Sequence, residues 1–295
     1  MGLFFERYEK SNALKRSYIK RFLPTDSAED PSMLDGMYQL PIALLETFTA
    51  IVFVGVYWIG CFVLRFCFKY RGSDNTIVGT ILSAFGVLYG LLLGLITVSA
   101  YETLSEVEAE ASSEALSILA LYRDVSGFSD PAREDLKTKL SVYCKFIIEE
   151  EWPQLRQGVI PQNSAPQIDS IRVAILDFNA DSRKAELIQT QAVKHFEEMV
   201  GHGRKRRYAA LAGIPTVMWY VLIVGTIFNF VLMWMFEMPL KLHLFLGGIL
   251  SFFLGALILL IAVLERPYQS IEYGVSPAPY EMVYQVMKAD RAATK

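Results

Sequence analysis

The chain has 295 residues, of which 53% are hydrophobic and 20% are charged, and its formal net charge is -3. Its mean hydropathy of +0.32 exceeds what a soluble domain of this size usually has, and its net acidity argues against a nucleic-acid partner. The three cysteines, Cys61, Cys67 and Cys144, show no pairing pattern typical of a disulfide scaffold.

Residues 1–38 form a basic amphipathic N-terminal segment. It lacks the short apolar core and cleavage site of a signal peptide. Six Lys or Arg residues alternate there with apolar and aromatic side chains. Such a segment is expected either to lie on an anionic membrane surface or to dock on a neighbouring subunit, and the sequence leaves both open. The apolar members are Phe4, Phe5, Leu14, Tyr18 and Phe22.

Four long apolar segments, grouped as two pairs around a polar middle, predict an integral membrane protein. A hydrocarbon core of roughly 30 Å requires about 20 apolar residues in helical form. We therefore expect two transmembrane hairpins, at 39–101 and at 214–265. The predicted spans are Thr47–Leu64, Ile77–Ala100, Ile214–Phe236 and Leu242–Leu264.

Basic residues near the spans indicate the orientation, because cytoplasmic flanks are enriched in Lys and Arg. They are frequent before the first span and again at Arg204–Arg207 before the third. This pattern predicts a multi-pass protein of the cell membrane with both termini and the 102–213 region in the cytoplasm. Arg65, Lys69 and Arg71 in the first hairpin oppose that assignment.

The 102–213 region is predicted to be a helical cytoplasmic region. No Gly or Pro occurs from Tyr101 to Arg123, so the second span should continue into it as one long helix. A second helix should begin at Pro131 and stop near Pro153. After a loop, a third helix should cover Gln167–Met199 and end at Gly201 and Gly203, and 266–295 should be a cytoplasmic tail.

Short motifs occur from the second span to the tail. They are Val78–Thr80, Tyr101 with Glu102, Val107–Ala111, Leu121–Arg123, Tyr143, Glu149–Pro153, Glu265–Tyr268 and Val275–Pro279. Through these motifs the chain resembles the bestrophin-like domain family, over about residues 40 to 285. One departure is Ser270, where a Gly is expected after the Arg-Pro-aromatic pattern.

The resemblance implies an all-α, bestrophin-like fold with four transmembrane helices and cytoplasmic termini. It also implies a homo-oligomer around a central axis, a pentamer by family analogy, and an ion pore lined by the second span. A likeness of fold does not by itself establish a function. The partners expected are therefore membrane lipid, further copies of the chain and inorganic ions.

Small residues form one stripe of the second span, at spacings of three and four. Such stripes usually allow close helix packing. A pore-lining or hinge role is the alternative interpretation. The packing candidates are Gly79, Ser83, Gly86, Gly90 and Gly94.

A second stripe, facing away from the glycines, combines leucines within the membrane with glutamates just beyond it. The leucines could form an apolar neck, and the glutamates could form carboxylate rings that favour cations in a symmetric assembly. Alternatively, the leucines face lipid or a neighbour and the glutamates are a solvated helix face. The neck candidates are Leu88, Leu91, Leu95 and Ser99, and the ion-selectivity candidates are Glu102, Glu106, Glu110 and Glu114.

Other chemistry is sparse, and no enzyme is expected. No nucleophile or phosphate-loop motif is present, and Glu149–Glu151 are interpreted as a solvated face. His195 and His202 lie too far apart along a helix for one metal, so neither a metal site nor a cofactor is predicted, although Ca2+ could visit crowded carboxylates. His243 is expected at a membrane edge, and Asn229 is expected to bond across helices.

The sequence therefore favours a homo-oligomeric ion channel with passive conduction through a central pore. The family likeness alone favours chloride, whereas the acidic stripe favours cations, and cation permeability is slightly preferred. The competing interpretation is a non-conducting membrane scaffold or signalling protein, in which the spans only assemble and the cytoplasmic helices bind a partner.

Overall fold

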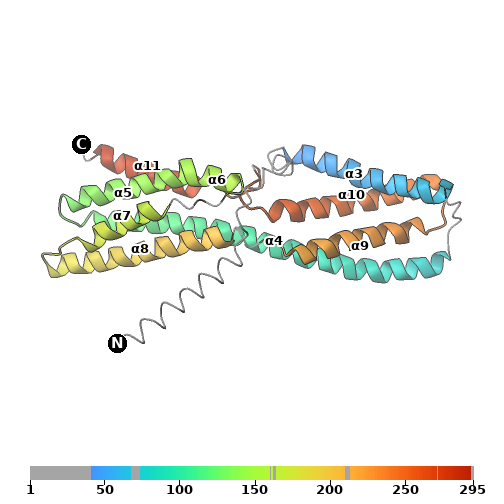
Figure 1. The fold of residues 1–295 in the computed structure, drawn as a ribbon, viewed down its shortest axis with the longest axis horizontal. Helices are drawn as coiled ribbons and strands as arrows, with labels where there is room; N and C mark the ends of the chain where they lie inside the picture. Colours follow the sequence, from blue (N-terminus) through green and yellow to red (C-terminus); the bar gives the residue numbers. More distant parts are fainter. Residues whose placement is uncertain are drawn as a thin grey trace, which may run out of the picture. The chain divides into compact units, whose positions relative to one another are not determined.

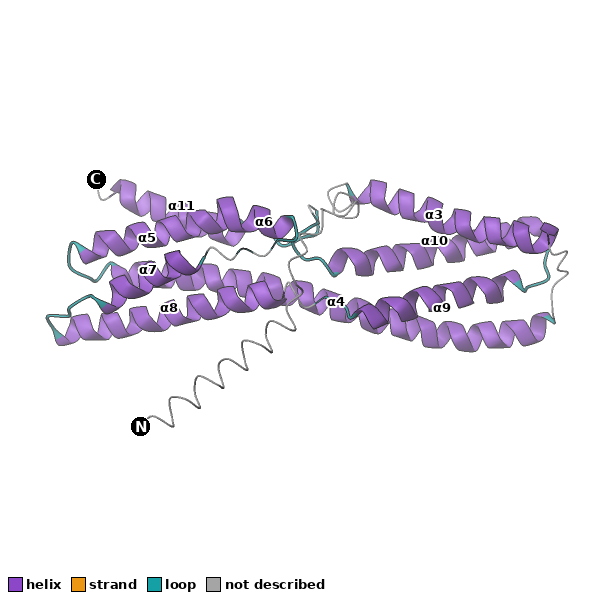
Figure 2. Cartoon of the chain, in the orientation of Figure 1, coloured by secondary structure: helices purple, strands orange, loops and turns teal. Residues whose placement is uncertain are grey.

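A computed structural model describes residues 41–67, 74–159, 161, 164–209, 213–270 and 272–293. The basic N-terminal segment predicted at 1–38 lies outside the described residues. The described residues form helices joined by loops, without a strand (Figure 2). They belong to one compact unit that spans residues 37–295.

Four helices of the described part are long and apolar enough to cross a membrane, which agrees with the predicted spans. Two of them, α9 and α10, pack against the first half of the longest, α4, and α3 packs against α10 (Figure 1). Their bounds are α3 Ile42–Phe62, which continues as a π-helical turn η1 Val63–Cys67, α4 Asn75–Val125, α9 Thr216–Trp234 and α10 Leu240–Leu264.

Helix α4 is the central element of the fold. It runs for 51 residues without a break, so the prediction that the second span continues into the polar region is confirmed. The side chain of Asp74 caps its start by accepting a hydrogen bond from the Thr76 amide at 2.9 Å. At the same end, the Asn75 amide exchanges two 2.8 Å hydrogen bonds with the backbone of Glu237 and joins the two hairpins.

Glycines let aromatic side chains fill the space between the spans. A methyl group at Gly225 of α9 would overlap the Tyr89 ring of α4. Glycine therefore permits this close contact. The Tyr89 hydroxyl donates to the Leu222 carbonyl at 2.7 Å and lies 2.8 Å from the Thr226 hydroxyl, so the buried ring has its polar partners.

The second half of α4 is covered by the helices of the polar region and of the tail (Figure 1). The longest contact is with α8, which lies alongside α4. The tail contains a helix, α11, which the sequence analysis did not predict. The helices are α5 Ala132–Phe146, the π-helical turn η2 Ile147–Glu151, α6 Trp152–Arg156, α7 Ala165–Leu176, α8 Arg183–Ala209 and α11 Ala278–Ala293.

Three predicted helix boundaries are wrong, and one of them is the end at Gly201 and Gly203, because α8 continues through both glycines to Ala209. The second polar helix does not stop at Pro153, because this proline lies in the first turn of α6, where its missing N–H is tolerated. The third helical stretch is not one helix, because the chain breaks after Leu176 and restarts at Arg183. The Ser182 hydroxyl caps this restart by accepting from the Ala185 amide at 3.2 Å.

Candidate functional site: the second span and its polar base

Helix α4 presents one buried face, and the face runs through both halves of the helix. Taking Gly90 as origin and 100° per residue, most of its buried side chains lie at roughly 220° to 320°. Tyr89, Leu93, Ile96 and Ala100 contribute to this face within the membrane, and Val107 continues it beyond. The protomer therefore covers only part of the surface of α4.

Among the described residues, the neck candidates lie on a largely uncovered face of α4, and Leu95 and Ser99 border a groove beside the start of α9. Leu88, Leu91 and Leu95 are 68%, 62% and 62% exposed, at roughly 100° to 160° around the helix. Ser99 is also exposed. Contiguous exposed apolar side chains mark a surface that meets lipid or another subunit.

The small-residue stripe borders the buried face and is open along most of its length. A methyl group placed at Gly86, Gly90 or Gly94 would meet no described atom within 4 Å. At Gly79 it would lie 3.5 Å from the Phe236 ring. Within the protomer, Gly86, Gly90 and Gly94 therefore do not pack against another described helix. Ser83 is exposed as well.

The four glutamates do not share one environment. Glu102 and Glu106 are exposed, Glu110 is partly covered, and Glu114 is completely buried. The cause is the helical drift of about 40° per four residues, which brings Glu114 to roughly 240°, onto the buried face. We therefore do not retain Glu114 as an ion-facing residue.

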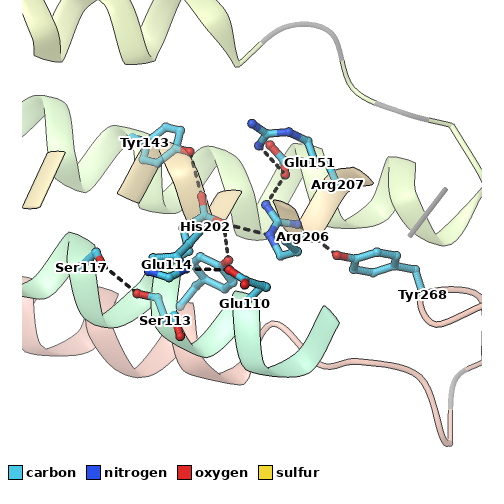
Figure 3. Close-up of polar contacts among 11 residues, drawn as sticks. Glu110, Ser113, Glu114, Ser117, Tyr143, Glu151, His202, Arg206, Arg207 and Tyr268 are labelled. Atoms are coloured by element: carbon cyan, nitrogen blue, oxygen red, sulfur yellow. Dashed lines mark hydrogen bonds and ion pairs between the residues drawn. The ribbon is translucent and has the colours of Figure 1, made fainter. Parts of the chain in front are cut away.

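Glu114 instead belongs to a buried polar cluster around Arg206 of α8 (Figure 3). The Arg206 Nε donates to Glu114 Oε2 at 2.8 Å, and its Nη2 donates to Glu151 Oε1. All three side chains are fully buried. Buried charges require such pairing, because an unpaired charge in a low-dielectric interior is costly.

Two tyrosines complete the coordination of the Glu114 carboxylate. Tyr143 of α5 donates to Oε1 at 2.9 Å, and Tyr280 of α11 donates to Oε2 at 2.7 Å. Glu114 thus joins α4 to α5, α8 and α11 through its two oxygens. Because the donors come from separate helices, the cluster holds the polar bundle around the extension of the second span.

The π-helical turn η2 and the tail also contribute residues to the cluster. Glu149 and Glu150 at η2 are exposed, whereas Glu151 is buried, so the interpretation of all three as a solvated face is wrong for Glu151. The Arg206 guanidinium also lies 5.2 Å from the Trp152 ring centre. From the tail, the Tyr268 hydroxyl accepts from Arg206 Nη1 at 3.3 Å.

Burial and charge shift the pKa values in this cluster. Burial, followed by the carboxylates of Glu114 and Glu151, raises the pKa of Tyr143 well above its ordinary value. Burial also raises the pKa of Tyr280 and, with a smaller contribution from Glu114, raises the pKa of the Cys144 thiol to about 12. Burial alone would lower the pKa of Arg206, but Tyr280, Glu114 and Glu151 outweigh it and raise it.

Two histidines of α8 reach carboxylates of α4 at the edge of the cluster. His202 Nδ1 lies 2.6 Å from Glu110 Oε2, and His195 Nδ1 lies 2.6 Å from Asp124 Oδ2. Lys205 adds a 3.4 Å contact to Glu110 Oε1. Among the described residues, no group of three or more His, Cys, Asp or Glu side chains is placed to hold a metal ion.

Two further polar residues lie in the spans. His243 lies in the first turn of α10 and is only 2% exposed. The Asn229 amide, expected to bond across helices, donates to the Gly225 carbonyl of its own helix at 3.1 Å. Its contact is therefore a local packing contact.

The sequence analysis missed the cluster as a site, although its signals were visible. Tyr143, Glu151, Trp152 and Tyr268 all fall within the motifs on which the family resemblance rests. The Glu149–Pro153 and Glu265–Tyr268 motifs are separated by more than a hundred residues along the chain, and only the folded structure brings them together. The local signal that Glu151 differs from Glu149 and Glu150 was its position directly before Trp152 and Pro153.

The chain matches the family model described as "Bestrophin-like domain" over residues 48–280. It is similar to two solved variants of a bacterial bestrophin homologue from Klebsiella pneumoniae. One has 12% identity, 82% of this chain and 99% of that chain covered, and a TM-score of 0.60. The other has 12% identity, coverages of 83% and 98%, and a TM-score of 0.61.

A third structure, described as a membrane protein, gives a TM-score of 0.62 at 11% identity and covers 82% of this chain and 97% of that chain. No curated protein matches this sequence significantly. At these identities the structural likeness concerns the fold alone, and it agrees with the all-α, four-span architecture.

Proposed function

We propose that this chain, which belongs to the bestrophin-like domain family, forms a symmetric homo-oligomeric ion channel with α4 around the central axis. The observation that supports this most directly is the uncovered leucine face of α4. Leu88, Leu91 and Leu95 are each more than 60% exposed, and α4 is the helix that continues furthest beyond the membrane. Apolar rings of this kind can gate a pore by dewetting.

The small-residue face supports the same arrangement. In a ring of α4 helices, one face meets the axis and an adjacent face meets the next subunit. The open stripe at Gly86, Gly90 and Gly94 would let a neighbouring helix approach closely. The subunit number we propose is five, by likeness to bestrophins.

We propose a modest preference for cations. Glu102 and Glu106 are exposed and follow the leucine face just beyond the predicted end of the span. Repeated around an axis, they would form carboxylate rings that attract cations, and hard ions such as Ca2+ would prefer their oxygens. Glu110 is engaged by His202 and Lys205, and Glu114 by Arg206, so they contribute less.

The orientation we propose places both termini, the polar bundle and the tail in the cytoplasm, with the four spans in the cell membrane. The basic run Arg204–Arg207 is only partly available as a topology signal, because Arg206 is buried and Arg207 contacts Glu151 at 3.5 Å. Arg204 and Lys205 are exposed and fit the cytoplasmic headgroup region.

The test is the reversal potential of purified protein in planar bilayers under an asymmetric KCl gradient. We expect reversal nearer the K+ potential, and Glu102→Gln with Glu106→Gln should move it toward the Cl- potential. Glu108→Gln is the matched control, because Glu108 is exposed but lies on the glycine side at roughly 0°.

Other outcomes are equally informative. Reversal near the Cl- potential in the unchanged protein would contradict the cation preference and retain the channel. Reproducible silence of a correctly assembled oligomer would favour the alternative, a non-conducting membrane scaffold or signalling protein.

A further inference from the structure

A charged groove lies between the beginning of α5 and the end of α11, at the end of the polar bundle where α11 finishes (Figure 1). Its volume is about 690 Å³, within the range of about 300 to 1,000 Å³ found for small-molecule sites. Four cationic and two acidic side chains line it, which leaves a positive excess. They are Arg133, Lys137, Lys288, Arg291, Glu134 and Asp290.

The acidic side chains of the groove are already engaged. Asp290 Oδ2 accepts from Lys137 Nζ at 2.8 Å and from the Tyr122 hydroxyl at 2.9 Å. The hydrogen bond from Lys137, and then that from Tyr122, lowers the pKa of Asp290. Arg133 Nη2 donates to Asp130 Oδ2 at 2.6 Å, and its Nε lies 3.6 Å from Glu134 Oε1, so Arg133 is partly neutralised. The carboxylates of Asp290 and Glu134 are therefore already paired and do not neutralise Lys288 or Arg291.

Lys137 is a built-in charge at the base of the groove. The residue is only 8% exposed, and its ammonium lies 4.8 Å from the Tyr122 ring centre as well as on Asp290. A lysine is rarely so buried unless it is paired with an opposite charge. The ion pair between Lys137 and Asp290 joins α5 to α11. The groove thus has a defined floor, because one side chain of each helix is held there.

Lys288 and Arg291 are the cationic side chains of the groove whose charge is not balanced by a described carboxylate. Neither has an ion pair with a carboxylate in the described part of the chain. Arg291 Nη2 donates to the Thr138 hydroxyl at 2.5 Å, which orients the guanidinium across from α11 to α5. Arginine binds phosphate through a planar pair of donors, and lysine acts as a point charge.

We propose that this groove binds a small, multiply charged phosphate anion, with Lys288 and Arg291 as its principal contacts and Arg133 as a third. The lining has no aromatic side chain on which a nucleobase could stack. Ala292 is the one apolar residue among the described lining residues, and its methyl group is too small to bind an acyl chain. An inorganic polyphosphate or a compact polyphosphorylated metabolite fits this chemistry, and the proposal does not depend on ion conduction.

A simpler interpretation is that cations in the last turns of α11 only stabilise its helix dipole. The two interpretations differ in what the cations do to a ligand. A dipole effect acts on the stability of α11 and leaves phosphate binding weak and unspecific. A binding site discriminates between one phosphate group and several.

The test is calorimetric titration of sodium tripolyphosphate into the full-length protein in detergent, at about 50 mM salt to limit screening. We expect saturable binding, with orthophosphate at least about tenfold weaker because it reaches fewer cations. The double variant Lys288→Gln with Arg291→Gln should weaken tripolyphosphate about tenfold or more.

The matched control is Lys184→Gln with Arg156→Gln, which removes the same charges from exposed positions outside the groove. It should keep the affinity within about twofold. An equal loss in both double variants would mean unspecific attraction and would overturn the proposal, as would the absence of binding to the unchanged protein. Thr138→Val, which frees Arg291 without altering charge, should weaken binding by a smaller factor.

Discussion

Gly203 of α8 lies directly against the carboxylate of Glu114 in α4. A methyl group on Gly203 would be 2.5 Å from Glu114 Oε1 and 2.8 Å from Cδ. This glycine was expected to end its helix, but α8 continues through it to Ala209. Its role is to let α8 approach α4 closely enough for Arg206 to reach Glu114.

Gly203→Ala should destabilise the protein by about 1 to 3 kcal/mol, because the added methyl displaces a buried ion pair. Gly201→Ala is the control. Nothing lies within 4 Å of a methyl group there, so the alanine should be neutral or slightly stabilising in the helix. Thermal unfolding in detergent, followed by circular dichroism, measures both, and equal midpoints would contradict the close contact.

Glu114→Ala should destabilise the polar bundle by about 3 to 5 kcal/mol, because it leaves Arg206 with an incomplete set of buried partners. Glu106→Ala removes the same group from an exposed position two turns earlier and should change the unfolding midpoint little. If the two variants unfold alike, Glu114 is not the structural residue described above.

Leu91→Ala with Leu95→Ala should widen the proposed neck and raise the leak current. The two side chains are 62% exposed in the protomer, so their truncation should leave the protomer core intact. Flux of a marker ion into proteoliposomes measures the leak. Val87→Ala with Val98→Ala provides a comparison at other exposed positions of the same helix. Unchanged flux in an assembled oligomer would argue against the neck.

Gly90→Val should dissociate the oligomer and leave the protomer folded. No described atom of the protomer lies within 4 Å of a methyl group at Gly90, so any clash must come from another subunit. Gly55→Val is the matched control, because a methyl group at Gly55 of α3 would also meet no described atom within 4 Å. Size-exclusion chromatography with light scattering reports the mass, and an unaltered oligomer would place the subunit contact elsewhere.

Alkaline pH should destabilise the polar bundle, with Cys144 as the first contributor. Burial raises the pKa of its thiol to about 12, whereas the unfolded value is about 8.5. A raised pKa in the folded state gives stability that is complete below about pH 8.5 and is lost progressively toward pH 12. Tyr143 and Tyr280 act in the same direction at higher pH.

Cys144→Ala tests this contribution. Between pH 8 and pH 10, the unchanged protein should lose about 2 kcal/mol through this thiol, and the variant should not. The unfolding midpoint at each pH gives the comparison. Parallel losses in both proteins would assign the alkaline sensitivity to other groups.

The sequence by itself determined the membrane class, the four spans and the continuous second helix. These properties follow from local composition, because runs of apolar residues and the absence of Gly and Pro act over neighbouring residues only. It also predicted two faces of the second span, because a regular helix converts spacing into direction. The leucines, Glu102 and Glu106 are exposed, whereas Glu114 of the same predicted stripe is buried, and the roles of these residues in a pore stay predictions.

The tertiary structure alone decided which charged residues are buried. Glu114 and Glu106 are both glutamates at the same spacing, yet only Glu114 meets Arg206, Tyr143 and Tyr280 from three other helices. Glu151 likewise differs from Glu150 only in direction at the η2 turn. Burial of a charge depends on partners that are distant along the chain, and local periodicity contains no information about where those partners lie.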